Sequence, residues 1–192
     1  MRITGGRFRG RLLAAPGDEH VRPTADRVRQ AIFNILAHRD FGTRFALEDA
    51  RAADLFAGTG AMGLEALSHG ARFCLFVDSA AESRALLRRN VESLALTGAT
   101  KIWRRDATAL GPMPAGSGGP FDLVFLDPPY RQNLIAPALA SLRDGGWLAP
   151  HALVVAERAL DETIPPVETF AQIETRAYGD TAIDFLMFSA RD

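Results

Sequence analysis

The sequence is poor in cysteine and contains no long apolar run. Its one cysteine, Cys74, cannot form an intramolecular disulfide, which excludes a disulfide framework. No segment reaches the roughly 18 consecutive apolar residues of a membrane helix, and the opening stretch MRITGGRFRGRLLAAPG lacks the apolar core of a signal peptide. We therefore expect a cytoplasmic protein without a membrane partner. Cys74 lies in the apolar run RFCLFVD, where we expect a core residue rather than a catalytic thiol.

The sequence also has very little lysine and a net charge close to zero. Lys101 is the only lysine, so the 22 basic residues are nearly all arginine, and the net charge is -1. Residues 1–30 hold seven arginines and three acidic residues, a net charge of +4, whereas the remainder carries -5. This basic end suggests a local contact with a polyanion, although a solvated arm would explain the charge equally well. The 192 residues suffice for one sizeable core, so we expect a single domain over 1–192 with a basic N-terminal arm at 1–23.

After the arm, apolar residues alternate between helical spacing and short extended runs. PTADRVRQAIFNILAHRD predicts a helix over 24–39 with Thr24 as its N-cap. Five apolar runs separated by helical stretches predict strands at 52–58, 72–78, 101–107, 121–127 and 152–158. Two later extended stretches meet at Gly179-Asp180, a hairpin signal. These patterns predict an α/β fold: a mostly parallel seven-stranded sheet with helices on both faces and a C-terminal antiparallel hairpin.

A glycine-rich loop follows the first predicted strand. In DLFAGTGAMG, Gly58, Gly60 and Gly63 have the spacing G-x-G-x-x-G between a strand and a helix, as in loops that bind nucleotide cofactors. The helix N-terminus presents free N–H groups to a ligand. Asp78 ends the second predicted strand twenty positions after Gly58, where a carboxylate can accept hydrogen bonds from a ribose diol. NAD and S-adenosylmethionine fit these features equally well, because both contain adenosine.

Three further features favour S-adenosylmethionine. Asp54, inside the first strand, would attract a sulfonium or ammonium group and repel a pyrophosphate. Asp106 lies at the carboxyl end of the third strand, where it could accept a hydrogen bond from an adenine amine, and the fourth strand ends in DPPY, residues 127–130. Ligands of open α/β sheets bind beyond the carboxyl ends of the strands, where these carboxylates converge. The expected cofactor-binding residues are Asp54, Phe56, Gly58, Gly60, Asp78, Ser79, Asp106 and Ala107.

Each of these carboxylates also has a structural interpretation. Asp54 could be a partly buried strand residue, Asp106 a turn former and Asp78 a helix N-cap. Their positions at the ends of successive strands favour the cofactor site over three separate structural roles. The four histidines show no ligand spacing, so we expect no metal.

The motifs together resemble a known enzyme family. LFAGTGAMGLEALSHGA followed by FLDPPY is similar to class I S-adenosylmethionine-dependent methyltransferases that modify exocyclic amines of bases. ITGGRFRGRLL, RPTADRVRQAIFNIL and YGDTAIDFLMF resemble the bacterial small-subunit (16S) ribosomal RNA guanine-N2 methyltransferases, over almost the whole chain. The resemblance implies a Rossmann-like class I fold, S-adenosylmethionine as cofactor and methyl transfer to the N2 amine of a guanine in ribosomal RNA. Adenine-N6 methyltransferases of DNA or RNA share DPPY and are the nearest alternative. An NAD oxidoreductase or a non-catalytic RNA-binding protein would leave parts of the site without a role.

The DPPY motif suits the chemistry of an exocyclic amine, whose lone pair is delocalised into the base. Asp127 and the carbonyl of Pro128 could accept the two N–H groups and direct the lone pair at the methyl group. Pro128 and Pro129 stiffen the loop. Tyr130 offers a ring on which an extruded base can stack. We therefore expect Asp127, Pro128, Pro129 and Tyr130 to carry the reaction, and whether Asp127 accepts the proton stays open.

The resemblance also implies that the arm and RPTADR contact RNA. The candidate residues are Arg7, Arg9, Arg11, Arg22 and Arg27. Arg27 and Arg29 could equally be exposed positions of the first helix. The expected partner is ribosomal RNA within a small ribosomal subunit or its precursor, bound by a monomer.

Overall fold

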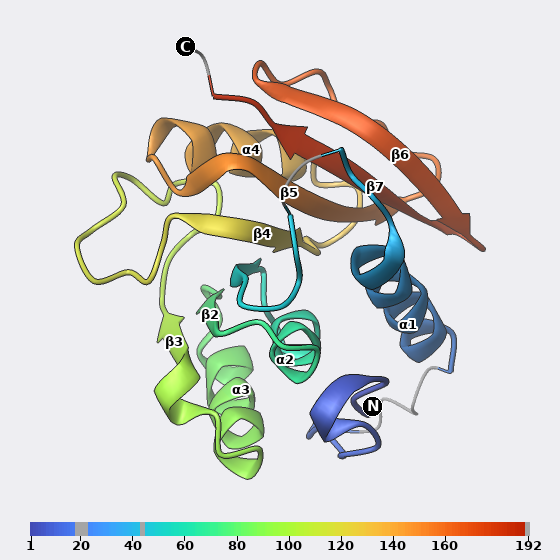
Figure 1. Cartoon of the computed structure of the whole chain (residues 1–192), viewed down its shortest axis with the longest axis vertical. Coiled ribbons are helices and arrows are strands. Elements are labelled where there is room, and N and C mark those ends of the chain that lie inside the picture. The colour runs from blue at the N-terminus through green and yellow to red at the C-terminus, as the bar shows by residue number, and fades with distance from the viewer. Residues whose placement is uncertain (18–22, 43–44, 191–192) are drawn as a thin grey trace.

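The computed structural model describes residues 1–17, 23–42 and 45–190 and contains one seven-stranded sheet. The strand order is β3-β2-β1-β4-β5-β7-β6 (Figure 1). The strands are β1 (Arg51–Leu55), β2 (Phe73–Val77), β3 (Thr100–Trp103), β4 (Phe121–Leu126), β5 (Leu148–Ala159), β6 (Phe170–Tyr178) and β7 (Thr181–Phe188). The first five pair in parallel, whereas β7 runs antiparallel to both β5 and β6. The predicted mostly parallel sheet with a terminal hairpin at Gly179-Asp180 is therefore confirmed.

All five predicted strands differ in length from the observed ones, and the third and the fifth differ most. The third ends at Trp103 instead of residue 107, so Asp106 lies in the loop that follows it. The fifth extends over Leu148–Ala159 instead of 152–158 because its first part also pairs with β4 and its last part pairs with β7. Neither pairing partner can be read from local apolar spacing, since both are set by the order of strands in the sheet.

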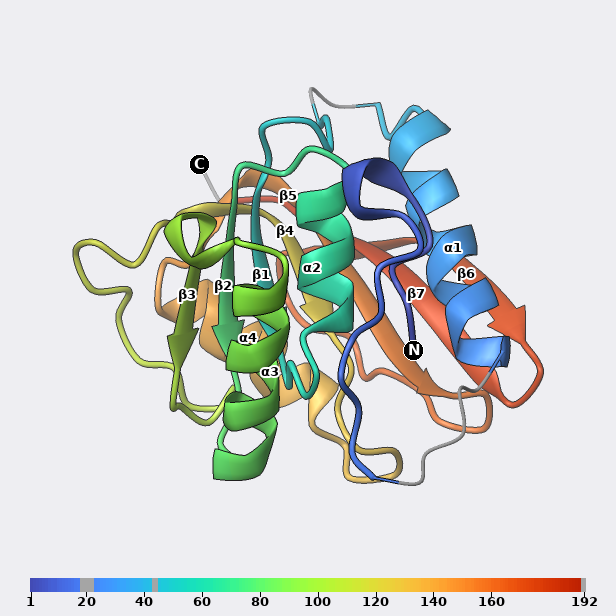
Figure 2. The ribbon, with the colours of Figure 1, turned by 90° about the horizontal axis from the view of Figure 1, so that it is seen from below.

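Helices cover both faces of the sheet, as expected. They are α1 (Pro23–His38), α2 (Ala61–Ser68), α3 (Ala81–Ser93) and α4 (Ile135–Asp144), with short 3-10 turns η1 (Gly6–Phe8) and η2 (Thr97–Ala99). Figure 2 shows α1, α2 and α3 on the near face of the sheet, and α4 on the far face. The helix α1 begins at Pro23, one residue before the predicted Thr24, so Thr24 lies inside the helix rather than at its cap. Within the described residues, none of the helices has the length and apolar character needed to traverse a bilayer.

Each face of the sheet has its own apolar core. Phe33, Phe76 and Phe125 belong to the core beneath α1, α2 and α3, while Phe121 and Trp147 belong to the one beneath α4. Cys74 is fully buried in the first core, which confirms its predicted packing role. Parallel strands buried on both faces need two such layers, which explains the nearly continuous apolar runs in their sequences.

The N-terminal arm, as far as residue 17, packs against α2 and α3 rather than extending into solvent (Figure 2). Ile3 and Leu13 are buried, and Asn90 of α3 exchanges hydrogen bonds with the backbone of Ala14. Gly6 has φ +69°, and a Cβ there would lie 2.0 Å from the backbone oxygen of Ser68. The close approach of the arm to α2 therefore requires glycine at this position.

Glu65 of α2 joins the arm to the rest of the fold. Its fully buried carboxylate accepts hydrogen bonds from the backbone N–H of Thr4 (2.9 Å) and Gly5 (2.7 Å) and from Nε of Arg29 (2.9 Å). The Arg29 guanidinium, 4% exposed, also donates to the carbonyl of Arg2 and to Asp26. Burial alone would raise the pKa of Glu65, but hydrogen bonds from His69 and Thr4 and the charge of Arg29 outweigh it, so the pKa is lowered.

Replacing Glu65 by alanine should destabilise the protein by about 3 kcal/mol or more, because it leaves the Arg29 charge buried without a partner. Chemical denaturation followed by circular dichroism measures the change. The surface pair of Arg143 and Asp144 provides a control, since Asp144→Ala should leave stability nearly unchanged. Equal, small effects of the two substitutions would contradict the role assigned to Glu65.

Candidate active site

The site lies at the carboxyl ends of the central strands, where the strand order reverses. From β1 the chain proceeds to β2 and β3 on one side, and from β4 to β5 on the other. Such a switch point leaves a crevice between the loops that follow the two central strands. The glycine loop after β1 and DPPY after β4 both open into it. The sequence motifs are thus brought together by the topology of the sheet.

The glycine loop is held in an unusual conformation by its neighbours. Gly60 has φ +79° and precedes α2, and a Cβ there would lie 2.2 Å from Cδ1 of Leu87 in α3. The backbone N–H of Gly58, which has φ +54°, donates to Oδ2 of Asp78 (2.8 Å). Glycine is required because a side chain at Gly60 would meet α3 and because positive φ is costly for other residues.

Asp54 lies beneath this loop and is 2% exposed. Its Oδ2 accepts a hydrogen bond from the backbone N–H of Gly63 (2.9 Å) in α2. Burial raises the pKa of Asp54 to about 8, against the lowering effect of the Gly63 bond and with a smaller contribution from the charge of Asp78. In the absence of a cation the carboxyl group therefore holds a proton at neutral pH.

A cavity of about 470 Å³ opens beside the ends of β2 and β3. Of the predicted cofactor residues, those that line it are Phe56, Asp78, Ser79, Asp106 and Ala107. Asp78 accepts hydrogen bonds from the loop through Gly58 and from the backbone N–H of Ala80 (2.8 Å) at the start of α3. Asp106 accepts two hydrogen bonds from Thr108, which lower the pKa of its carboxyl group. These two carboxylates therefore have structural partners and also face the cavity.

A second cavity, of about 330 Å³, lies between the glycine loop, α1 and the end of β5. It is lined by Asp54 and Gly58 from the predicted cofactor set and by Glu157 from β5. Phe56, Asp127 and Tyr130 line both cavities. The DPPY motif thus stands where the two cavities meet, with one cavity on each side of it.

Asp127 follows the last residue of β4 and is exposed to both cavities. The residue as a whole is exposed, although neighbouring protein atoms desolvate its carboxyl group. This desolvation, followed by the negative charges of Glu157 and Asp54, raises the pKa of Asp127 above its usual range. The carboxyl group is therefore a stronger proton acceptor than an ordinary aspartate when ionised.

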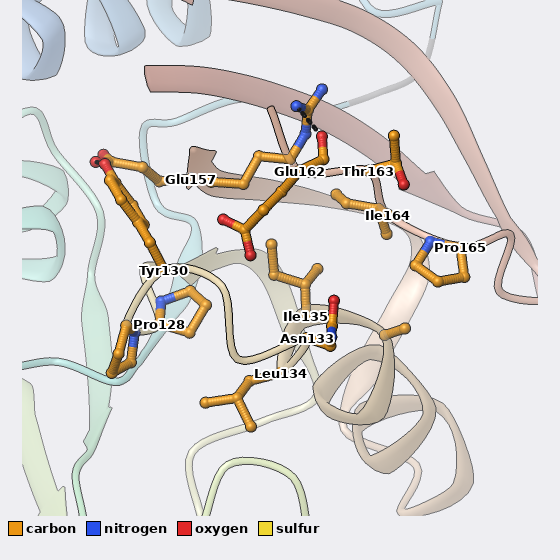
Figure 3. A pocket seen from close by; sticks show the side chains of 13 residues that line it. Pro128, Tyr130, Asn133, Leu134, Ile135, Glu157, Glu162, Thr163, Ile164 and Pro165 are labelled. Carbon is orange, nitrogen blue, oxygen red and sulfur yellow. Dashed lines mark hydrogen bonds between the residues drawn. The ribbon is translucent and has the colours of Figure 1, made fainter. Parts of the chain in front are cut away.

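Tyr130 is held by two residues from the C-terminal part of the sheet. Its hydroxyl donates to Oε1 of Glu157 (2.5 Å) and lies 3.0 Å from Oγ1 of Thr181. Figure 3 shows the Tyr130 ring extending from DPPY towards the Glu157 carboxylate. Burial and the bond to Glu157 raise the pKa of the tyrosine hydroxyl, which therefore stays protonated. The ring is thereby fixed in orientation while 38% of the residue remains exposed.

Four of the predicted RNA-binding arginines, Arg7, Arg9, Arg11 and Arg27, lie on the outer surface of the arm and of α1. Arg9 and Arg27 line a groove of about 420 Å³ together with Arg2 and Gln30. Arg7 lies over the ring of Phe8, 4.6 Å from its centroid, and Arg11 donates to the backbone oxygen of Ser93 (2.9 Å).

Of the other arginines in RPTADRVR, Arg22 lies outside the described residues. Arg29, for which the sequence left an exposed helix position open as an alternative, is instead buried in the ion pair with Glu65. Helical spacing could not indicate this, because it does not show that a buried carboxylate on α2 faces Arg29.

Sequence reasoning missed two polar residues of the second cavity, Glu157 and Thr181. Glu157 occurs in the segment VVAER near the end of β5, and Thr181 follows the hairpin turn. The parallel register pairs Leu126 with Ala156, so Asp127, the residue after β4, comes next to Glu157 of β5. An acidic residue near the end of a predicted strand could have marked Glu157 as a site residue. The sequence could not show that Asp127 is its neighbour, because that depends on the register of the two strands.

Known proteins share both sequence and fold with this chain. The family model described as conserved hypothetical protein 95 matches residues 1–187. Several relatives are named ribosomal RNA small subunit methyltransferase D. The one from Escherichia coli K12 is 37% identical over 167 residues, covering 87% of this chain and 79% of the relative. The one from Haemophilus influenzae is 30% identical over 180 residues, covering 93% and 89%.

Solved structures agree with these matches. An Escherichia coli structure described as a candidate methyltransferase is 31% identical, with a TM-score of 0.82, and the match covers 100% of this chain and 99% of that one. An RNA methyltransferase of Salinibacter ruber in complex with S-adenosyl-L-homocysteine shares the fold at 14% identity and a TM-score of 0.63, over 86% and 93% of the two chains. The predicted Rossmann-like class I methyltransferase fold is confirmed. The chain belongs to the bacterial family of ribosomal RNA small subunit methyltransferase D.

Proposed function

We propose that this protein transfers a methyl group from S-adenosylmethionine to the exocyclic N2 amine of a guanine in small-subunit ribosomal RNA. The observation that carries the proposal is the position of Asp127 and Tyr130 between two cavities, one suited to an adenosine and one open to a substrate base. The family membership supports ribosomal RNA as the substrate. The whole chain would act as a single methyltransferase domain and as a monomer.

The cofactor would lie across the glycine loop, with its adenosine in the cavity of about 470 Å³. Asp78 would accept hydrogen bonds from the ribose, and Asp106 would accept one from the adenine amine. Phe56, Ser79 and Ala107 would form the walls around these groups. Asp54, buried beneath the loop, would face the cationic methionine part, where an ammonium group stabilises its ionised form.

The target amine would enter from the second cavity. The Asp127 carboxylate and the Pro128 carbonyl would accept its two N–H groups, and the base would stack on Tyr130, a contact worth about 1–3 kcal/mol. The nitrogen lone pair then forms the N–C bond as the S–C bond breaks. The electron pair of the S–C bond returns to sulfur, whose positive charge is thereby lost, and S-adenosylhomocysteine is released. The positively charged nitrogen loses a proton to Asp127 or to water. Alignment of the two reactants supplies much of the rate.

RNA would be held outside the cavity by the basic residues of the arm and α1. Arg9 and Arg27 line one groove, and Arg7 and Arg11 lie on the same arm. Arginine forks suit phosphate groups, and such contacts position the nucleic acid without reading its sequence. We propose the same role for Arg22. An assembled or precursor small subunit is the proposed form of the substrate.

The identity of the methylated base tests this proposal directly. With labelled S-adenosylmethionine and unmodified small subunits or naked ribosomal RNA, we expect N2-methylguanosine on nucleoside analysis. N6-methyladenosine would instead assign the protein to the alternative class that shares DPPY. Absence of transfer despite cofactor binding would show that the substrate is a different molecule.

Replacing Asp127 by alanine should lower turnover by about 100-fold or more, the scale of removing one positioned polar group, because the amine is no longer oriented. Cofactor affinity, measured by calorimetry, should stay within a few-fold of wild type. Asp144→Ala, which removes an exposed carboxylate of α4, is the matched control and should leave turnover unchanged. Wild-type turnover of the Asp127 variant would remove this residue from the reaction.

Cofactor binding should strengthen with pH up to about 8. Because the folded-state pKa of Asp54 is raised from 3.8 to about 8, the group is protonated at pH 6 and must ionise to pair with an ammonium group. We expect affinity to rise severalfold per pH unit between pH 6 and 8. Asp54→Asn keeps an acceptor for Gly63 but cannot ionise, so this variant should bind more weakly and show no rise. A rise of equal slope in both proteins would rule out Asp54 as its origin.

A further inference from the structure

Glu157 places a second carboxylate beside Asp127 in the substrate cavity. Asp127 follows the end of β4 and lies beside Glu157 of β5, one step beyond the paired Leu126 and Ala156. Both line the cavity of about 330 Å³. The charge of Glu157 contributes to the raised pKa of Asp127, so the two groups interact electrostatically.

The bonds around Glu157 leave one of its oxygens for a ligand. Its Oε1 accepts the hydroxyl of Tyr130 at 2.5 Å (Figure 3), and among the described residues no protein group donates a hydrogen bond to Oε2. The adjacent Arg158 turns its guanidinium to Asp184, and Arg29 is bound to Glu65 and Asp26. Within the described part of the chain, no ion pair neutralises Glu157.

We infer that Glu157 is a specificity-determining residue that accepts a hydrogen bond from N1–H of the target guanine, while Asp127 accepts one from the N2 amine. This inference rests on the proposed guanine-N2 activity. Guanine presents adjacent N1–H and N2–H donors on its Watson–Crick edge, which match two adjacent carboxylates. Adenine presents an N1 lone pair beside its N6 amine, and that lone pair would face the Glu157 carboxylate.

Glu157 also positions Tyr130 through the hydrogen bond that it accepts from the tyrosine hydroxyl. The hydroxyl bond from Tyr130 orients the Glu157 carboxyl group, so the stacking ring and the acceptor for N1–H are held as one unit. Thr181 supports this unit through its contact with the tyrosine hydroxyl. A role confined to fixing Tyr130 would affect every stacked base equally, whereas an acceptor for N1–H distinguishes bases by that hydrogen. This difference separates the two roles experimentally.

The base analogue 2-aminopurine provides the test, because it keeps the amine at C2 but has a lone pair at N1. Once the methylated position is mapped, ribosomal RNA carrying guanine or 2-aminopurine at that position is prepared by ligation. For the wild-type enzyme we expect kcat/KM to favour guanine by about 100-fold or more, since a site built for a donor rejects an analogue that lacks it. Equal use of the two bases by the wild-type enzyme would overturn the inference without any variant.

Glu157→Gln should reverse part of this preference. The substituted amide keeps an oxygen for Tyr130 and places an N–H donor where Oε2 stood, which suits the N1 lone pair of 2-aminopurine. We expect the guanine preference to fall by about 10-fold or more, with improved kcat/KM on the analogue. Thr181→Val is the matched control: it loosens Tyr130 without altering Glu157, so it should reduce activity on both bases and leave their ratio unchanged.

The outcomes separate this inference from the proposed function. A wild-type product of N2-methylguanosine with an unchanged preference in Glu157→Gln would retain the function and reject the role of Glu157. A wild-type product other than N2-methylguanosine would reject the proposed function, and the inference with it.

Discussion

The buried contact between Glu65 and Arg29 is the interaction on which the arrangement of the site depends. It fastens α1 to α2 and, through Thr4 and Gly5, brings the N-terminal arm against the same helix. Both ions are removed from water, so each is tolerated only because the other and several backbone groups satisfy it. The contact also shapes the cavity itself, because Met1 at the start of the arm and Arg29 line the substrate side of the site. The arm therefore forms part of the cavity wall as well as the surface that we propose for RNA.

The site concentrates carboxyl groups where two donor-rich ligands are expected. Asp54 and Asp127 have raised pKa values because neighbouring protein atoms desolvate their carboxyl groups and because acidic neighbours add to the cost of ionisation. A cationic cofactor and a base with N–H donors would remove that cost. The arrangement thus exchanges some stability of the ligand-free protein for ligand binding, a common cost of functional sites. Glycine at Gly60 and the stiff proline pair after Asp127 keep these groups in place before either ligand arrives.

Much of the fold could be predicted from local patterns. Apolar runs located five strands, helical spacing located α1, and Gly179-Asp180 located the hairpin. These features depend on residues close together in sequence, so periodicity and turn chemistry suffice to find them. The length of β5 and the end of β3 could not be found in this way, since pairing with distant strands decides where each strand stops.

The chemical groups of the site can be identified from the amino-acid sequence alone: the glycine loop, the carboxylates at the strand ends and DPPY. The parallel topology predicted from it also implies that these groups share one edge of the sheet. Which further residues join them depends on how the chain folds. Glu157 stands beside Asp127 because of the register between β4 and β5, and Arg29 is buried because Glu65 faces it from another helix. Both contacts join residues about 30 or more positions apart in sequence, and local spacing carries no information about the register or packing that brings such residues together.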